Sequence, residues 1–327
     1  MAAFRSLVRP ATQRGHLTGA RVQSASALYV CKDSSGRPAF LLPISALLPP
    51  IRLGNLEVRH RVRCKIFADD QAILIASATL ISCLSDDTRL QAYFVQALGG
   101  LLSMRSGAED PAALGPMLEG LSELFQAVSS EPASTAQGLW AELALIHSAE
   151  DPVSAVKAWH SEVDDLYDFS SGTERIEVKS SSDKTRCHYF RLEQVDSPAC
   201  ITVLIVSMLV DKAGRGLTLG ELWDRCRERL AASPQLQLKL DALCFRALGK
   251  HWHRWRETSY DHARAIASLA FFDARSVPKP STPMPAGVSE VRFVSDLSTI
   301  AMIDVSKPKY RGPLMLALGV GRSNKDD

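Results

Sequence analysis

A chain of 327 residues, 46% hydrophobic and 23% charged, has the composition of a globular protein with one large core or two domains, which excludes collagen-like, mucin-like and wholly disordered chains. Its net charge of +2 is the sum of three unequal blocks: +9 over residues 1–65, −12 over 66–165 and +5 over 166–327. A basic block can bind phosphate backbones, whereas an acidic block with buried carboxylates can bind a metal ion.

The cysteines and the apolar runs favour a cytoplasmic protein. The seven cysteines are odd in number and include no CxxC pair, so we expect reduced thiols and no zinc ribbon. No apolar run reaches the roughly 18–20 residues of a membrane span. Residues 1–32 are basic and contain no acid, as in a mitochondrial transit peptide, but they run directly into an apolar segment, which favours a basic arm.

Residues 1–87 are expected to form a β-rich N-terminal module. Apolar segments separated by turn sequences predict strands at 27–31, 39–43, 56–63 and 72–77. In the third segment Arg59, Arg61 and Arg63 occupy alternate positions, so a strand would present all three arginines on one face. That face is either a solvated sheet surface or a surface that contacts nucleic-acid phosphates.

A helical pattern follows over residues 88–132, where two amphipathic segments are expected to form a connector. The helix expected at 136–148 places Leu139, Leu143 and Ile146 in a buried stripe, with Glu142 on its flank. A carboxylate at such a position must be neutralised, paired or used to bind a metal ion. A second short helix is expected to begin at Pro152 and to end near residue 160.

Three short strands are expected next, at 166–169, 175–179 and 186–190, then a helical piece near 192–195 and a long apolar strand at 199–210. Glu177 and Lys179 share one face of the second strand, and Asp168 lies on the strand before it. Two carboxylates a few ångströms apart repel each other unless a divalent cation lies between them, and oxygen ligands suit Mg²⁺. The pattern therefore indicates either a metal-dependent nuclease or surface charges on an edge hairpin.

This stretch resembles the PD-(D/E)XK nuclease superfamily and, more narrowly, a bacterial family of PD-(D/E)XK proteins found beside restriction and phage-defence genes. The resemblance spans about residues 15–300 and rests on GLWAEL at 138–143, AVKAW at 155–159, DF at 168–169, IEVKS at 176–180, RLEQ at 191–194, LTLGEL at 217–222 and GVSEVRF at 287–293. It implies an α/β (α+β) fold: a restriction-endonuclease-like core with a mixed central sheet flanked by helices at 133–327, including C-terminal strands, preceded by the smaller β-rich domain.

The resemblance also implies roles for individual residues. Asp168 and Glu177 become metal ligands together with the carbonyl of Val178, and Lys179 becomes the catalytic lysine. Glu142 is the acid on the helix, and Gln194 falls where the superfamily places a glutamine that touches the site or the substrate. Mg²⁺ is the expected cofactor, with Mn²⁺ as an alternative. The motif around Asp168 reads YDF rather than PD, which leaves the ligand in place.

The segment 246–256, RALGKHWHRWR, combines basic and aromatic residues without an acid. It is either a nucleic-acid-binding segment, in which Lys250, Arg254 and Arg256 contact phosphates, or an amphipathic turn with two core tryptophans. The sequence DKAGRG at 211–216 is expected to form a turn before a helix at 219–231. The last strands are expected at 288–294 and 299–305.

We therefore expect a metal-dependent DNA endonuclease that hydrolyses phosphodiester bonds in a bacterial restriction or anti-phage defence system. Its expected partners are DNA and other proteins of such a system, namely a helicase, a methyltransferase or an ATPase, and a homodimer would allow both strands to be cut. The alternative is a non-catalytic DNA-binding or scaffold subunit of a multi-protein defence complex. A nuclease that acts on RNA is a second alternative.

Overall fold

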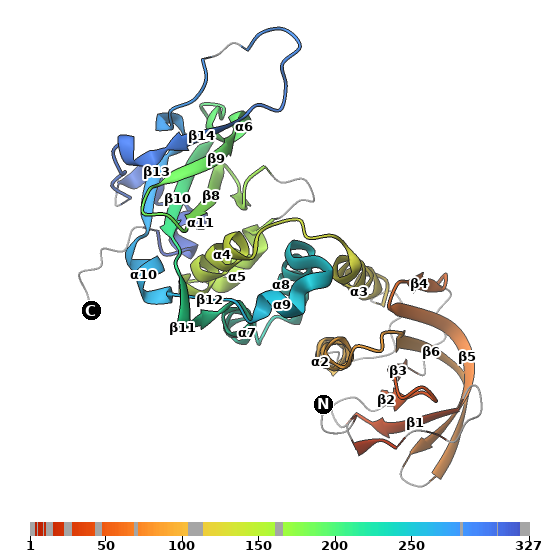
Figure 1. The fold of residues 1–327 in the computed structure, drawn as a ribbon. Coiled ribbons are helices and arrows are strands. Elements are labelled where there is room, and N and C mark those ends of the chain that lie inside the picture. Colours follow the sequence, from red (N-terminus) through yellow and green to blue (C-terminus); the bar gives the residue numbers. More distant parts are fainter. Residues whose placement is uncertain are drawn as a thin grey trace. The chain divides into compact units, whose positions relative to one another are not determined.

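The computed structural model describes residues 16–22, 28–42, 48–68, 71–103, 114–160, 166–281, 284–305 and 307–320, together with residues 4, 6–8 and 10. The chain divides into two compact units, Met1–Ser130 and Glu131–Asp327 (Figure 1). Their boundary falls within the polar sequence SSEPAST at 129–135. Across the described residues, no helix is long and apolar enough to cross a membrane.

The first unit is built on a six-stranded sheet that closes on itself. Its strands are β1 (His16–Arg21), β2 (Tyr29–Lys32), β3 (Pro38–Leu42), β4 (Ile51–Leu53), β5 (Leu56–Ala68) and β6 (Gln71–Cys83). The order is β1-β2-β3-β6-β5-β4, and β1 also pairs with β5, so five strands form a closed ring. Closure removes free edges and encloses an apolar core that includes Leu41 and Ile66. Ala27 and Pro43, at the ends of two predicted strands, lie outside the described residues.

Two helices belong to the same unit, α2 (Thr88–Ser103) and α3 (Leu114–Ser129). The buried ring of Phe94 on α2 lies 5.8 Å from Phe40 of β3 and 5.9 Å from Phe125 of α3, measured between ring centroids. The segment 88–132, expected to be a separate connector, therefore contributes its helices to the core of the first unit. Their apolar faces are buried against the sheet and against each other.

The second unit contains a four-stranded sheet of order β13-β10-β8-β7. Its strands are β7 (Phe169–Ser171), β8 (Glu174–Ser181), β10 (Thr202–Leu209) and β13 (Ala270–Asp273). β8 and β10 are parallel, whereas β7 and β13 are antiparallel to their neighbours. Helices α4 (Ala136–Ser148) and α5 (Pro152–Ala158) pack against β8 and β7. The expected mixed sheet flanked by helices is confirmed, and β10 is the long apolar strand because it lies inside the sheet.

The remaining elements of this unit surround the sheet. A ribbon of β9 (Cys187–Arg191) and β14 (Arg292–Asp296) contacts β8, and the one-turn helix α6 (Leu192–Val195) follows β9. The other helices are α7 (Leu219–Arg229), α8 (Pro234–Leu248), α9 (Trp252–Arg256), α10 (His262–Ala267) and α11 (Pro313–Ala317). Glu174 of β8 accepts a hydrogen bond from the backbone N–H of Leu314 at 2.9 Å, which attaches α11 to the sheet.

The turn predicted at 211–216 is wrong. Residues 212–216 belong to strand β11 (Lys212–Thr218), which pairs with β12 (Ser259–Tyr260). One of the glycines that suggested a turn instead allows close approach of the two backbones, because a Cβ at Gly216 would collide with the carbonyl of Tyr260. Glycine content alone does not distinguish these two uses.

One further prediction is corrected near the C-terminus, and the segment 246–256, which had two interpretations, takes a defined conformation. Residues 246–256 are helical, through α8, a 3₁₀ turn at Gly249–His251 and α9, because Trp252 packs against Trp223 and Phe245 at centroid distances of 6.5 and 5.1 Å. The segment predicted as a strand at 299–305 forms no ladder in the described structure. It begins in the last residue of a 3₁₀ turn at Leu297–Thr299, and the N–H of Ile303 donates a hydrogen bond to the carbonyl of Phe271 on β13.

Candidate active site

Five of the six residues expected in the site, all except Val178, line one cavity of about 530 Å³ in the second unit. They come from four places in the chain: Glu142 from α4, Asp168 from the residue before β7, Glu177 and Lys179 from β8, and Gln194 from α6. The i, i+2 spacing on β8 puts Glu177 and Lys179 on one face of the strand, as alternation predicts. The pairing of β7 with β8 brings Asp168 beside that face.

Helix α4 presents Glu142 because of how the helix begins and what it buries. Thr135 caps it by accepting a hydrogen bond from the N–H of Gly138 at 3.0 Å, and its bounds, Ala136–Ser148, are those predicted. Glu142 is buried along with the apolar residues of this helix. The indole N–H of Trp159 donates to Glu142 Oε2 at 2.7 Å, which orients this carboxylate.

Asp168 occupies the point where the ladder between β7 and β8 ends. Phe169 pairs with Ile176. Two residues further along β8, the N–H of Val178 donates to Asp168 Oδ2 at 2.7 Å instead of to a backbone carbonyl. Only 15% of the Asp168 side-chain surface is exposed. The carboxylate is therefore held by the strand that carries Glu177.

Gln194 connects the two charged residues of β8. Its Nε2 donates to Glu177 Oε1 at 2.6 Å and to the carbonyl of Leu166 at 3.1 Å, while its Oε1 accepts from the N–H of Arg191 at 3.0 Å. Lys179 Nζ lies 2.6 Å from the same Glu177 Oε1 and 3.4 Å from Gln194 Oε1. These contacts assign the orientation of the amide and fix both charged groups relative to each other.

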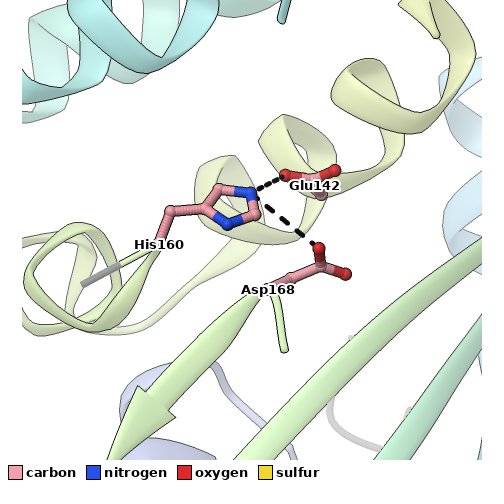
Figure 2. A group of neighbouring side chains, drawn as sticks. All are labelled: Glu142, His160 and Asp168. Carbon is pink, nitrogen blue, oxygen red and sulfur yellow. Dashed lines mark hydrogen bonds and ion pairs between the residues drawn. The ribbon is translucent and has the colours of Figure 1, made fainter. Parts of the chain in front are cut away.

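His160 also lines the cavity, which the sequence had not indicated. Its Nε2 lies 3.2 Å from Glu142 Oε2 and 3.8 Å from Asp168 Oδ1, between the two carboxylates (Figure 2). The three side chains offer ligand atoms that all lie within 4.8 Å of one another. In the sequence His160 only marked the end of a helix. The signal available was a histidine next to Trp159, a few residues before the Asp168 motif.

The backbone at His160 explains how the ring reaches this place. His160 has a φ of 39°, a left-handed conformation that is uncommon outside glycine. Its N–H donates to the carbonyl of Asp168 at 2.8 Å, and Trp159 forms a β-bridge with Phe169. These contacts hold the strained turn, which is a frequent property of functional sites.

The acidic groups of the cavity destabilise one another's charged forms. Burial raises the pKa of the Asp168 carboxyl well above its ordinary value, and the carboxylates of Glu177 and Glu142 raise it further. Burial also raises the pKa of Glu177, while the ion pair with Lys179 opposes the rise. A divalent cation would replace this repulsion with attraction, and carboxylate oxygens are its preferred ligands. The residues present therefore fit a bound Mg²⁺ or Mn²⁺.

The residues expected to bind nucleic acid lie elsewhere. Arg59, Arg61 and Arg63 are exposed on β5 of the first unit, where Arg61 has a φ of 54° and the pairing with β6 shifts register. In the second unit, Lys250 forms an ion pair with Glu131, Arg254 lies 5.9 Å from the Trp255 ring, and Arg256 lies 2.6 Å from Asp224 and 4.9 Å from the Trp223 ring. Trp252 is buried, so for this residue the interpretation as a core tryptophan holds.

Comparison with known proteins identifies a family to which this chain is similar. A family model described as "Putative PD-(D/E)XK family member, (DUF4420)" matches residues 2–298. No curated protein and no solved structure matches the chain. The matched span includes every residue that lines the cavity.

Proposed function

Because the chain belongs to this PD-(D/E)XK family, we propose that it is a metal-dependent nuclease that hydrolyses phosphodiester bonds in DNA. The observation that carries the proposal is that Asp168, Glu177 and Lys179, the residue types named in the family's motif, line one cavity. The Glu177 carboxylate that pairs with Lys179 is buried, whereas a surface charge on an edge hairpin would be exposed. This favours a nuclease over the hairpin interpretation.

The ligands proposed for the cation are the carboxylates of Asp168 and Glu177 and the carbonyl of Val178. When bound, the cation would stabilise negative charge on a phosphoryl oxygen and lower the pKa of water. Val178 is supported by strand geometry, because the N–H and C=O of one residue point to the same side of a strand. Since its N–H donates to Asp168 Oδ2, its carbonyl points to the side of β8 on which Asp168 lies.

Lys179 is proposed as the cationic group that binds the reacting phosphate. Its ammonium lies at the cavity, 2.6 Å from Glu177 Oε1 and 5.1 Å from the centroid of the Phe190 ring. Three N–H donors on one ammonium allow it to keep the contact with Glu177 and donate to a phosphate oxygen as well. Gln194 is a positioning residue, because it acts through Glu177 and Lys179.

Glu142 and His160 would supply a further part of the cation site. Glu142, His160 and Asp168 present two carboxylate oxygens and an imidazole nitrogen at a spacing that suits one ion. A nitrogen ligand favours Mn²⁺ and later transition metals, whereas Mg²⁺ prefers oxygen alone. We therefore assign to this chain a stronger response to Mn²⁺ than a site made only of carboxylates would have.

The wider setting stays a prediction from the family resemblance. It consists of restriction or anti-phage defence, with a helicase, a methyltransferase or an ATPase as partner and a homodimer as the assembly. The genes that lie beside the one encoding this chain would test it, since a methyltransferase or helicase neighbour supports defence.

A plasmid-cutting assay tests the nuclease proposal. Supercoiled DNA is incubated with the full chain and Mg²⁺ or Mn²⁺, with Glu177→Ala and Lys179→Ala as the variants, and a single-stranded RNA is tested in parallel. We expect cutting that requires the metal and falls by at least about 100-fold in both variants. Glu193→Ala is the matched control, because Glu193 is exposed on α6 and does not line the cavity.

The outcome also separates the alternatives. DNA binding without cutting under every divalent ion tested would favour the non-catalytic DNA-binding or scaffold subunit. Cutting of RNA alone would move the substrate from DNA to RNA and keep the site.

A further inference from the structure

The ribbon of β9 and β14 has one buried and one exposed face. On β9, His188 and Phe190 are buried, whereas Tyr189 and Arg191 are exposed. Their direct partners on β14 are also exposed: Val294 lies opposite Tyr189, and Arg292 lies opposite Arg191. The two strands lie side by side in the second unit (Figure 1). We call the surface formed by Tyr189, Arg191, Arg292 and Val294 the outer face of the ribbon.

Two like charges are paired on this face. Arg191 and Arg292 are direct cross-strand neighbours, an arrangement that destabilises an antiparallel pair. Within the described residues neither guanidinium forms an ion pair with a carboxylate. An anion bound between them would remove the repulsion, and the guanidinium fork matches phosphate oxygens. Arg246 of α8 lines the same cavity as both and adds a third positive charge.

An apolar pair lies next to the arginines. Tyr189 is 77% exposed and Val294 is 53% exposed, although both residue types are usually more buried. An exposed aromatic ring beside arginines is the combination with which proteins bind single-stranded nucleic acid, because bases stack on the ring while phosphates contact the cations. A duplex keeps its bases stacked on one another and offers Tyr189 no free base. The chemistry of this face therefore suits a single strand.

The outer face is connected to the catalytic residues. Tyr189, Arg191 and Arg292 line the cavity that also contains Glu177 and Lys179. The N–H of Arg191 donates to Gln194, which in turn holds Glu177. A strand bound along the ribbon would thus lead into the cavity.

We propose that the outer face of the ribbon binds a single-stranded segment of nucleic acid next to the site of cleavage, with Arg191 and Arg292 on its phosphates and Tyr189 stacked on a base. This rests on the proposed nuclease function and specifies the form of substrate that it engages. A second copy of this chain is the competing occupant. Face-to-face pairing of two copies would bring identical arginine pairs together, and like charges oppose such an interface.

Fluorescence anisotropy tests the inference with the full chain and a labelled oligonucleotide, either single-stranded or as a duplex. EDTA is present so that binding is measured without cleavage. We expect Tyr189→Ala to weaken single-strand binding by about tenfold and duplex binding by less than about twofold, while Tyr189→Phe binds like the wild type. Arg292→Ala should weaken binding of the single strand and reduce its salt dependence by about one phosphate contact.

Arg215→Ala is the matched control for charge, because Arg215 is an exposed arginine on β11 that does not line the cavity. An equal loss of single-strand and duplex binding in Tyr189→Ala, or an Arg292→Ala variant that behaves like Arg215→Ala, would overturn the inference and leave the nuclease assay unaffected. A dimer in light scattering that dissociates in Val294→Asp would overturn it in favour of a second copy. A wild-type chain that neither binds nor cuts nucleic acid counts against the nuclease proposal itself.

Discussion

The Nζ atom of Lys179 lies 2.6 Å from Oε1 of Glu177, two residues earlier on β8, and both side chains line the same cavity. The same oxygen also accepts a hydrogen bond from Gln194 Nε2 at 2.6 Å. Glu177 Oε1 is therefore held by a donor from its own strand and by a donor from α6. The position of Glu177, a proposed metal ligand, relative to Lys179, the proposed catalytic lysine, thus depends on Gln194 from α6.

Gln194→Leu should reduce both cleavage and cation affinity. The substitution removes the donor to Glu177 and leaves a buried carboxylate with one partner fewer, so we expect a loss of about tenfold or more in rate and a weaker Mn²⁺ affinity. Titration calorimetry with Mn²⁺ measures the affinity independently of catalysis, and Glu193→Ala provides the neighbouring control. A variant that unfolds at a lower temperature but keeps its affinity and rate would reduce Gln194 to a structural role.

His160→Ala should change metal preference more than it changes folding. Loss of the imidazole nitrogen should weaken Mn²⁺ binding by about 10- to 100-fold and affect Mg²⁺ less, because Mg²⁺ gains little from nitrogen ligands. Electron paramagnetic resonance of free and bound Mn²⁺ gives the affinity directly. His251→Ala is the control, since His251 is exposed and lies outside the cavity lining. Equal effects on the two ions would contradict the assignment of His160.

Acid should destabilise the fold through His188. Burial first, and then the positive charges of Lys179 and Arg186, lower the pKa of His188 from its ordinary 6.5 to about 4. The folded protein therefore binds this proton less readily than the unfolded chain. The contribution of neutral His188 to the free energy of unfolding is complete above about pH 6.5 and is lost as the pH falls toward 4. Between pH 7.5 and 5 the loss from this group amounts to about 2 kcal/mol.

His188→Gln removes that titration while keeping a polar group that can reach Ser207, the 2.8 Å partner of His188. Urea unfolding at the two pH values measures the difference between wild type and variant. The free energy of unfolding of the variant should fall less on acidification, and equal slopes for the two proteins would contradict the prediction.

Gly312→Ala should destabilise the second unit without affecting the cavity. A Cβ at Gly312 would collide with the carboxylate of Glu174, which accepts the hydrogen bond from Leu314 and attaches α11 to β8. We expect a loss of about 1–3 kcal/mol in the free energy of unfolding, with Mn²⁺ affinity unchanged. Gly115→Ala is the control, because a Cβ there meets nothing within 4 Å. Calorimetric scans of both variants measure the effect.

Local sequence determined the parts of the site that depend on one element. The apolar stripe beside Glu142 predicted a helix whose bounds the structure reproduces, because this periodicity acts within a few residues. The strand that carries Glu177 and Lys179 was predicted for the same reason, since alternation is a local property of an extended chain.

Only the tertiary structure determined which residues from distant segments contact those elements. The ring of His160 reaches Asp168 only because a left-handed turn is held by β7. Arg191 lies opposite Arg292 only because two strands more than 100 residues apart in the chain pair in one register. The glycine-rich sequence before α7 became a strand because Tyr260 packs against Gly216. Contacts of this kind depend on long-range packing and pairing, which local periodicity does not encode. The sequence by itself therefore pointed to the acidic residues and the lysine that line the cavity, but not to His160, Arg191 and Arg292, which line it as well.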